Sequence, residues 1–382
     1  MAIEKINIEQ FLQFAQLYPV LDVRSPAEYD HAHIPGAYSF PLFSDEERKV
    51  VGTTYKQQSR EAAIKVGLEF FGPKMRKMIE ETEAIVNSRK ASNGTSIVLV
   101  HCWRGGMRSA GVAWLLDLYG FKVYTLVGGY KFFRRWVLGQ FDCDWHFIIL
   151  GGYTGSGKTE LLKQLAFHGE HVIDLESIAN HKGSAFGNIG LPPQPTQEMF
   201  ENALAVQMHS IKVGKQILKR DTNLEDASQY PGRPIWLEDE SQRIGTVNIP
   251  QALWLQMRKA RIYFVDIPFE ERLEHIVEEY GQLDKERMVS AIERIQKRLG
   301  GLETKTSIQL LKEGKMKDAF RILLKYYDKW YLKGLQSRSS ADDLCRSIKL
   351  NQVDALQNAI QLMKEKDTNT LLKTSTNEPG YR

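Results

Sequence analysis

The chain has 382 residues, of which 42% are hydrophobic and 26% charged, and a formal net charge of +4. This length predicts two or three domains, and the composition is typical of a globular protein in water. The absence of an 18-residue apolar run and of an apolar signal-peptide core excludes the membrane-spanning and secreted classes, so we expect no membrane association. The mild positive charge permits a nucleic-acid partner without requiring one.

The cysteines Cys102, Cys143 and Cys345 lie far apart in the sequence. Their spacing predicts neither a disulfide framework nor a structural zinc site, because zinc sites use closely spaced ligand pairs. We therefore expect reduced cysteines, a cytoplasmic location, and no haem, flavin or zinc cofactor.

Residues 1–140 alternate strand and helix patterns, which predicts a parallel α/β sheet. Between about residues 44 and 95 the sequence is charged and helical in pattern, and this stretch is predicted to be an insertion. Strands are predicted at residues 20–25, 38–42, 97–100 and 123–127, and helices at 8–17 and 109–119.

A short loop after the apolar strand at 97–100 holds His101 and Cys102, followed by two glycines and a helix pattern from Arg108. At such a crossing, backbone N–H groups and the positive end of a helix favour a thiolate. Arg104 and Arg108 add positive charge. The pattern predicts that Cys102 is a nucleophile in an anion-binding loop, with Arg104 and Arg108 beside it.

Three interpretations of Cys102 remain open from these residues. A buried structural cysteine is the least favoured, because an arginine and two glycines are poor core material. The pattern of His101-Cys102, five residues and Arg108-Ser109 matches the loop of cysteine phosphatases. The third interpretation is a cysteine that carries sulfur or selenium as a persulfide-type intermediate.

A second domain is predicted at residues 145–282, where the segment 152–159 fits the phosphate-binding pattern G-x-x-x-x-G-K-[ST] between a strand and a helix. Its glycines let backbone N–H groups point at phosphates, and Lys158 is expected to contact terminal phosphate oxygens. Thr159 is the expected ligand of a Mg²⁺ ion. The predicted phosphate-binding residues are Gly152, Gly155, Ser156, Gly157, Lys158 and Thr159.

Two later strands, at 171–175 and 234–238, end in runs of carboxylates. From these runs we select Asp174, Glu238 and Asp239, which are predicted to hold magnesium or orient a reactant; a solvated strand end or a helix cap is an equally good interpretation. The loop 181–187 mixes cation, hydroxyl and glycine. The candidate residues for contact with a nucleic acid or another substrate are His181, Lys182, Ser184, Phe186 and Arg135.

The C-terminal region, 283–365, is predicted to be helical, and residues 366–382 form a polar tail predicted to be disordered. Basic and aromatic residues alternate between 325 and 333. A helix with a buried aromatic face is the favoured interpretation, and a nucleic-acid surface is the other.

The segments 21–29, 33–37 and 126–130 resemble the recurrent motifs of the rhodanese domain. The Cys102 loop, however, has the larger number of residues that is typical of phosphatases. A rhodanese-like domain followed by a P-loop domain resembles the bacterial tRNA 2-selenouridine synthase family. Lys182, where arginine is expected, and Lys329, where proline is common, are the departures. The matching stretches begin at Val51, His101, Gly151, His181, Leu237 and Tyr326.

The resemblance implies an enzyme that replaces sulfur by selenium in the wobble 2-thiouridine of tRNA. Its selenium donor is selenophosphate, and an S-geranyl intermediate forms from geranyl diphosphate. It also implies that the Cys102 loop holds the selenophosphate-derived group and that the P-loop binds the diphosphate. A selenophosphate-supplying enzyme is an expected partner. Further expected contacts with the tRNA anticodon loop are Lys131, Arg134, Arg135 and the 325–333 cluster. The alternative is a cysteine phosphatase or sulfurtransferase fused to a nucleotide-binding P-loop domain.

Overall fold

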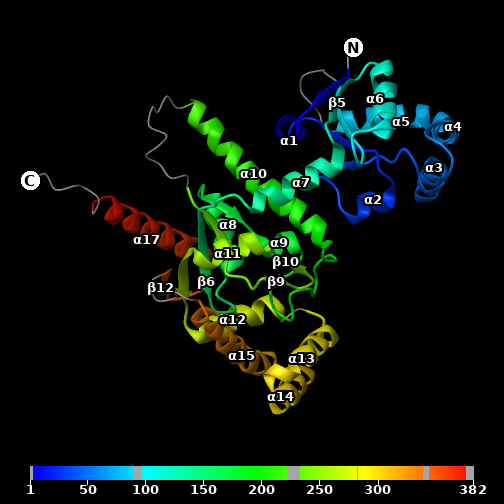
Figure 1. The fold of residues 1–382 in the computed structure, drawn as a ribbon. Helices are drawn as coiled ribbons and strands as arrows, with labels where there is room; N and C mark the ends of the chain where they lie inside the picture. Colours follow the sequence, from blue (N-terminus) through cyan, green and yellow to red (C-terminus); the bar gives the residue numbers. More distant parts are fainter. Residues whose placement is uncertain (1–2, 89–95, 222–232, 282, 339–343, 376–382) are drawn as a thin grey trace, which may run out of the picture. The chain divides into compact units, whose positions relative to one another are not determined.

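A computed structural model describes residues 3–88, 96–221, 233–281, 283–338 and 344–375, without the side chains of 215–221 and 368–375 (Figure 1). Two compact units are formed. The first comprises Met1–Phe141 with Glu198–Val206, and the second comprises Asp142–Gln197 with Gln207–Arg382. None of the helices in the described segments combines the length and the apolar character needed to cross a membrane.

The first unit is built on a five-stranded parallel sheet in the order β1-β5-β4-β2-β3. Strand β4 is central, and its residues Val98, Leu99 and Val100 are fully buried, as expected for a parallel strand covered on both faces. The predicted strands are present, and β1 is an additional edge strand. The strands are β1 (Glu4–Ile6), β2 (Val20–Asp22), β3 (Tyr38–Ser39), β4 (Ile97–His101) and β5 (Lys122–Leu126). The helices beside them are α1 (Ile8–Ala15), α2 (Pro26–His31), α6 (Met107–Tyr119) and α7 (Gly129–Phe141).

The charged segment between β3 and β4 is helical as far as Ser88, and residues 89–95 lie outside the described residues. Ser44 begins its first helix with a capping box that includes Glu47. Although these helices are polar on the outside, Phe71 and Met78 are buried in the core that the sheet shares with them. The elements are α3 (Asp45–Gln57), α4 (Arg60–Phe71), a 3₁₀ turn η1 (Gly72–Lys74) and α5 (Met75–Ser88).

The second unit has its own five-stranded parallel sheet in the order β12-β11-β6-β8-β7. Strand β6 lies between β8 and β11, so crossovers leave it in both directions, and such a switch point is where open α/β sheets bind ligands. The strands are β6 (Phe147–Gly152), β7 (His171–Ile173), β8 (Ile235–Glu238), β11 (Arg261–Asp266) and β12 (Cys345–Lys349). A small antiparallel pair, β9 (Arg243–Ile244) and β10 (Val247–Asn248), follows β8. The helices of this part are α8 (Lys158–Phe167), α9 (Leu175–Ala179), α11 (Gln251–Lys259) and α12 (Phe269–Tyr280), together with α10 (Gln197–Asp221), of which Glu198–Val206 belong to the first unit.

The C-terminal region differs from the prediction in two places. The helices α13 (Lys285–Leu299), α14 (Gly301–Lys312) and α15 (Met316–Gln336) are present, but β12 pairs with β11 and adds a strand to the sheet. Helix α17 (Ala355–Ser375) packs on α8 and buries Ala359 and Leu362 in the sheet core. It continues to Ser375, so that part of the segment predicted to be disordered is helical. Residues 376–382 lie outside the described residues.

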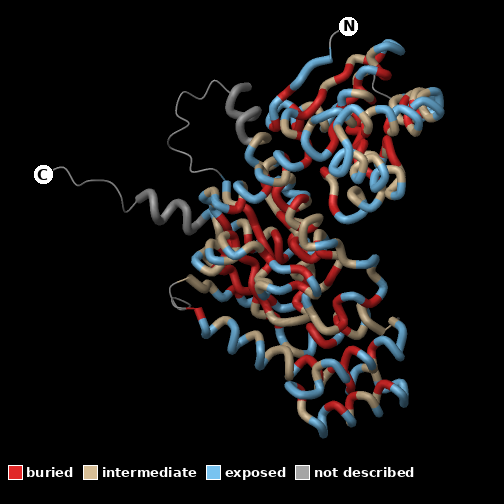
Figure 2. The backbone as a smooth tube through the Cα atoms, turned by 45° about the vertical axis from the view of Figure 1, so that its right-hand side comes forward, coloured by how far each residue is buried: buried red, intermediate tan, exposed pale blue. Residues whose placement is uncertain are grey.

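Buried residues concentrate along the strands and on the inner faces of the flanking helices in each unit (Figure 2). The predicted α/β class, with two parallel sheets and a largely helical C-terminal region, is confirmed. In each unit the candidate chemistry lies at the carboxyl end of a buried central strand, β4 in the first and β6 in the second.

Candidate functional site

The phosphate-binding segment is the loop that joins β6 to α8, as the sequence pattern predicts. Gly155 has a φ of +80°, and a Cβ there would lie 2.7 Å from the Ile276 side chain and 2.8 Å from the Arg272 carbonyl oxygen. Only glycine fits this turn. Gly152 donates its N–H to the Tyr331 hydroxyl at 3.1 Å, and Ser156 Oγ donates to the Tyr153 carbonyl oxygen at 2.7 Å.

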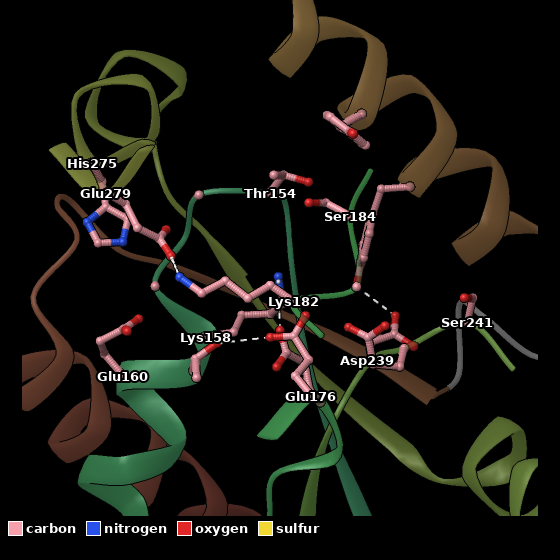
Figure 3. A pocket seen from close by; sticks show the side chains of 18 of the residues that line it. Thr154, Lys158, Glu160, Glu176, Lys182, Ser184, Asp239, Ser241, His275 and Glu279 are labelled. Carbon is pink, nitrogen blue, oxygen red and sulfur yellow. Dashed lines mark hydrogen bonds and ion pairs between the residues drawn. The ribbon is translucent and has the colours of Figure 1, made fainter. Parts of the chain in front are cut away.

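The loop borders a cavity of about 250 Å³ (Figure 3). Lys158 Nζ donates to the Gly152 carbonyl oxygen at 3.1 Å and lies 3.6 Å from Glu238 Oε1. The Thr159 hydroxyl donates to Glu176 Oε2 at 3.3 Å. The lysine and the threonine of the motif thus contact the backbone of the loop itself and two carboxylates of the cavity wall.

Three carboxylates meet beside this loop, where Glu176, Glu238 and Glu240 place one oxygen each within 4.8 Å of the others. Burial raises the pKa of all three carboxyl groups, and repulsion by neighbouring carboxylates adds to the effect, from Glu238 on the other two and from Asp174 on Glu238. Lys158 lowers each pKa. Glu238 is 4% exposed, and its buried Oε2 has no hydrogen-bond partner among the residues that the structure describes. Oxygen ligands with excess negative charge and an unpaired acceptor fit a divalent cation such as Mg²⁺.

Of the predicted acids, the structure brings only Glu238 into this cluster. Asp174 is the N-cap of α9 and accepts the Ser177 N–H at 2.8 Å. Asp239 Oδ2 accepts from the Tyr331 hydroxyl at 2.6 Å, and its Oδ1 pairs with Arg338.

Glu176 and Glu240 were not among the predicted acids, although both stand in the same carboxylate runs. Their positions after two parallel strands could have indicated this cluster. Strands β7 and β8 end at the same sheet edge, where the carboxylates that follow them converge.

Of the predicted contact residues in the loop 181–187, Lys182 and Ser184 line the cavity, whereas His181 and Phe186 are buried. Lys182 pairs with Glu279 and lies 5.4 Å from the Tyr280 ring, and Ser184 also lines the cavity (Figure 3). His181 is buried, and burial lowers its pKa. Phe186 is buried beside Tyr280 and belongs to the helical core of α12–α15.

A small apolar crevice of about 20 Å³ adjoins the phosphate cavity and shares Thr154, Ser184, Tyr280 and Tyr327 with it. Its remaining lining is hydrocarbon or aromatic. Those side chains are Phe186, Ile276, Phe320, Leu323 and Leu324.

The aromatic and basic segment 325–333 lies on α15 and forms hydrogen bonds with the phosphate site and the loops beside it. Tyr327 accepts the Ala185 N–H at 3.2 Å, and Asp328 accepts two bonds from Arg272, at 2.9 and 2.8 Å. Tyr331 is bonded to both Gly152 and Asp239. Part of the aromatic face is therefore buried, as favoured from the sequence, whereas Trp330 is 38% exposed.

In the first unit, Cys102 lies between the end of β4 and the start of α6. Its sulfur is almost fully buried, accepts the Gly106 N–H at 3.3 Å, and lies 3.2 Å from Ser109 Oγ. The Cys102 carbonyl oxygen accepts the Tyr130 N–H at 2.9 Å. Gly129 has a φ of +58°, and a Cβ there would lie 2.3 Å from that oxygen, so this close approach requires glycine.

The arginines near Cys102 differ in their surroundings. Arg108 Nη1 donates to Glu28 Oε2 at 2.6 Å; burial would raise the pKa of Glu28, but this arginine holds it below its usual range. Arg104 and Arg135 are exposed. Arg134 donates to Asn202 Oδ1 at 3.1 Å and also pairs with Glu198 and Glu201, so carboxylates already neutralise this predicted tRNA contact.

A buried cysteine at a helix N-terminus in one α/β unit, together with a P-loop in another, defines a rhodanese-like domain fused to a phosphate-binding domain. Residues 8–135 match the rhodanese-like domain model, and residues 145–361 match the model described as the tRNA 2-selenouridine synthase AAA domain. The chain belongs to the tRNA 2-selenouridine synthase family.

Three relatives, each named tRNA 2-selenouridine synthase, illustrate the similarity. The Nitrosomonas europaea protein is 35% identical over 267 residues, which cover 69% of this chain and 63% of that protein. The Bdellovibrio bacteriovorus protein is 36% identical, covering 73% and 69%. The Sulfurovum sp. protein is 34% identical over 347 residues, covering 82% and 87%. The predicted family and its enzyme class are thereby confirmed.

Proposed function

We propose that this chain replaces sulfur by selenium in the wobble 2-thiouridine of tRNA, with selenophosphate as donor and an S-geranyl-2-thiouridine intermediate. The observation that carries the proposal is the joint presence, in one member of this family, of Cys102 at a helix N-terminus and a complete P-loop. The reaction is placed in the cytoplasm, and a selenophosphate-supplying enzyme is the expected upstream partner.

The P-loop binds the diphosphate of geranyl diphosphate. Backbone N–H groups and Lys158 supply the anion site. The adjoining apolar crevice beside Phe186 has a volume of only about 20 Å³, so it has to widen to receive the hydrocarbon chain. A Mg²⁺ ion held by Thr159, Glu176, Glu238 and Glu240 would neutralise charge on the departing diphosphate. Attack of the thiouridine sulfur on the first geranyl carbon forms the C–S bond and releases diphosphate.

The Cys102 loop holds the selenophosphate. The N–H groups at the start of α6 and the exposed Arg104 suit a tetrahedral anion. Geranylation turns sulfur into a good leaving group. The selenium of selenophosphate then adds at C2 of the base, the C2–S bond breaks, and geranyl thiol departs with a proton. Water then cleaves the P–Se bond and releases phosphate.

The test uses the purified full chain, an anticodon stem–loop with wobble 2-thiouridine, geranyl diphosphate and selenophosphate, with mass spectrometry of the nucleosides. Cys102→Ser should stop selenation and leave geranylation, and Lys158→Ala should stop geranylation. Cys143→Ser is the matched control and should change neither selenation nor geranylation.

Two outcomes would contradict the proposal. The wild-type chain would fail to change the thiouridine, or it would hydrolyse ATP in step with turnover and ignore geranyl diphosphate. Phosphoester hydrolysis without any RNA product would instead favour the cysteine-phosphatase alternative.

A further inference from the structure

Trp330 stands at the rim of the phosphate cavity and has no role in the chemistry described above. The residue is 38% exposed, so part of its surface is open to solvent beside a ligand site. The Arg298 guanidinium lies 5.5 Å from the ring centroid and the Lys333 ammonium 5.0 Å from it. Both cations lie over the ring. An aromatic ring with cations packed against it matches the chemistry of a nucleotide, which has a flat base and an anionic backbone.

The helix that carries Trp330 is fixed on both sides of this residue. Asp328 forms its paired bonds with buried Arg272, and Tyr331 is bonded to Gly152 and to Asp239. The backbone at Trp330 is therefore held in place before any ligand arrives. A pre-positioned ring loses little conformational entropy when a base stacks on it, which favours binding.

The charge distribution separates this rim from the cavity below it. Inside, Lys158 lies next to Glu238, and Lys182 pairs with Glu279. On the rim, Arg298, Lys329 and Lys333 are exposed, and none of them forms an ion pair within the described part of the chain. Their positive charge remains available for a phosphate backbone.

We infer that Trp330 is a stacking platform for an unpaired nucleobase of the RNA substrate, with Arg298 and Lys333 contacting the neighbouring phosphates. The inference rests on the proposed function for the identity of the substrate as RNA. Anticodon-loop bases can be splayed out and stacked on aromatic side chains, whereas paired bases cannot. The platform would therefore deliver a single-stranded nucleotide to the mouth of the P-loop cavity.

Leu332 offers a matched control on the same helix. It is 39% exposed, close to the exposure of Trp330, but it does not line the cavity. A general effect of removing an exposed apolar side chain from α15 should therefore be the same at both positions, whereas loss of stacking should occur at Trp330 alone.

The experiment measures binding of a fluorescein-labelled anticodon stem–loop RNA to the full chain by fluorescence anisotropy. Trp330→Ala should weaken binding about tenfold, Trp330→Phe should fall between this variant and the wild type, and Leu332→Ala should bind as the wild type does. A blunt RNA duplex of equal length should bind equally to all four proteins. Arg298→Gln with Lys333→Gln should reduce the slope of log K against log salt by about 1.4.

Equal RNA affinities for Trp330→Ala and Leu332→Ala would overturn the inference, as would an equal loss for the duplex. If Trp330→Ala binds RNA normally but loses binding to another protein, the surface serves a protein partner and the inference fails. These results are separate from failure of the proposed function, which shows as wild-type protein that leaves the thiouridine unmodified.

Discussion

The buried pair of Arg272 and Asp328 should be the strongest single attachment of α15 to the phosphate site. Arg272 is 3% exposed, and its guanidinium donates twice to Asp328, once to the Ile267 carbonyl oxygen at 3.1 Å, and once to the Thr154 carbonyl oxygen at 3.0 Å. Asp328→Ala removes two of these acceptors and leaves a buried positive charge without its counter-ion.

Breaking a buried ion pair costs about 3–5 kcal/mol, and we expect about 3 kcal/mol because two backbone acceptors remain on Arg272. Asp328→Asn keeps an acceptor without the charge and should cost less. The loss of stability should be confined to the second unit. Hydrogen-exchange mass spectrometry is the suitable assay because it reports on each unit separately. A change of 3 kcal/mol corresponds to a roughly 150-fold loss of protection in the amides of β6.

Glu270 provides the control, because it also accepts two bonds from an arginine, Arg321, but this pair lies at the surface. Glu270→Ala should leave the protection of β6 unchanged. The reasoning is refuted if Asp328→Ala changes protection in β6 by less than fivefold, or if β4 in the first unit loses as much.

Three further predictions concern the other sites. Gly129→Ala should displace the Cys102 loop and stop selenation but not geranylation. Gly139→Ala lies on the same helix, where a Cβ meets nothing within 4 Å, and should leave both reactions unchanged. Nucleoside mass spectrometry measures both products. Mg²⁺ should raise the thermal midpoint of the second unit in calorimetry; Glu238→Gln should abolish this rise, and Asp174→Asn, which keeps a helix cap, should not. Burial alone would raise the pKa of Asp22, but His101 and Arg24 hold it below its usual range. The stability that the ionised Asp22 contributes is therefore complete above about pH 4 and is lost as the pH falls through the lowered pKa. Asp22→Asn should remove that part of the acid dependence of stability, as measured by circular dichroism.

The local motifs were predictable from the sequence because their geometry is encoded within a few adjacent residues. The glycines of 152–157 lie between an apolar strand and a helix, and this context is sufficient to place the P-loop. The same holds for Cys102, since the strand before it and the helix after it fix where its sulfur meets backbone N–H groups.

The features that were not predicted depend on residues far apart in the chain. Strand β12 is polar and buries mainly Ile348, so its sequence has no apolar run, and only pairing with β11 makes it a strand. Asp239 follows β8 as a magnesium ligand would, yet Tyr331 and Arg338 bind its oxygens. Glu240 joins the carboxylate cluster instead. No local pattern distinguishes these two neighbours.

The hydrogen bond between Gly152 and Tyr331 joins residues 179 positions apart, which has a consequence for synthesis of the protein. At translation rates of about 5–20 residues per second, roughly 10–35 s pass between the two residues. During this interval the nascent P-loop lacks the helix that covers it, and β11 lacks its outer neighbour, β12. The phosphate site therefore emerges from the ribosome in an open form, and a diphosphate ligand can find a complete pocket only after α15 has been made.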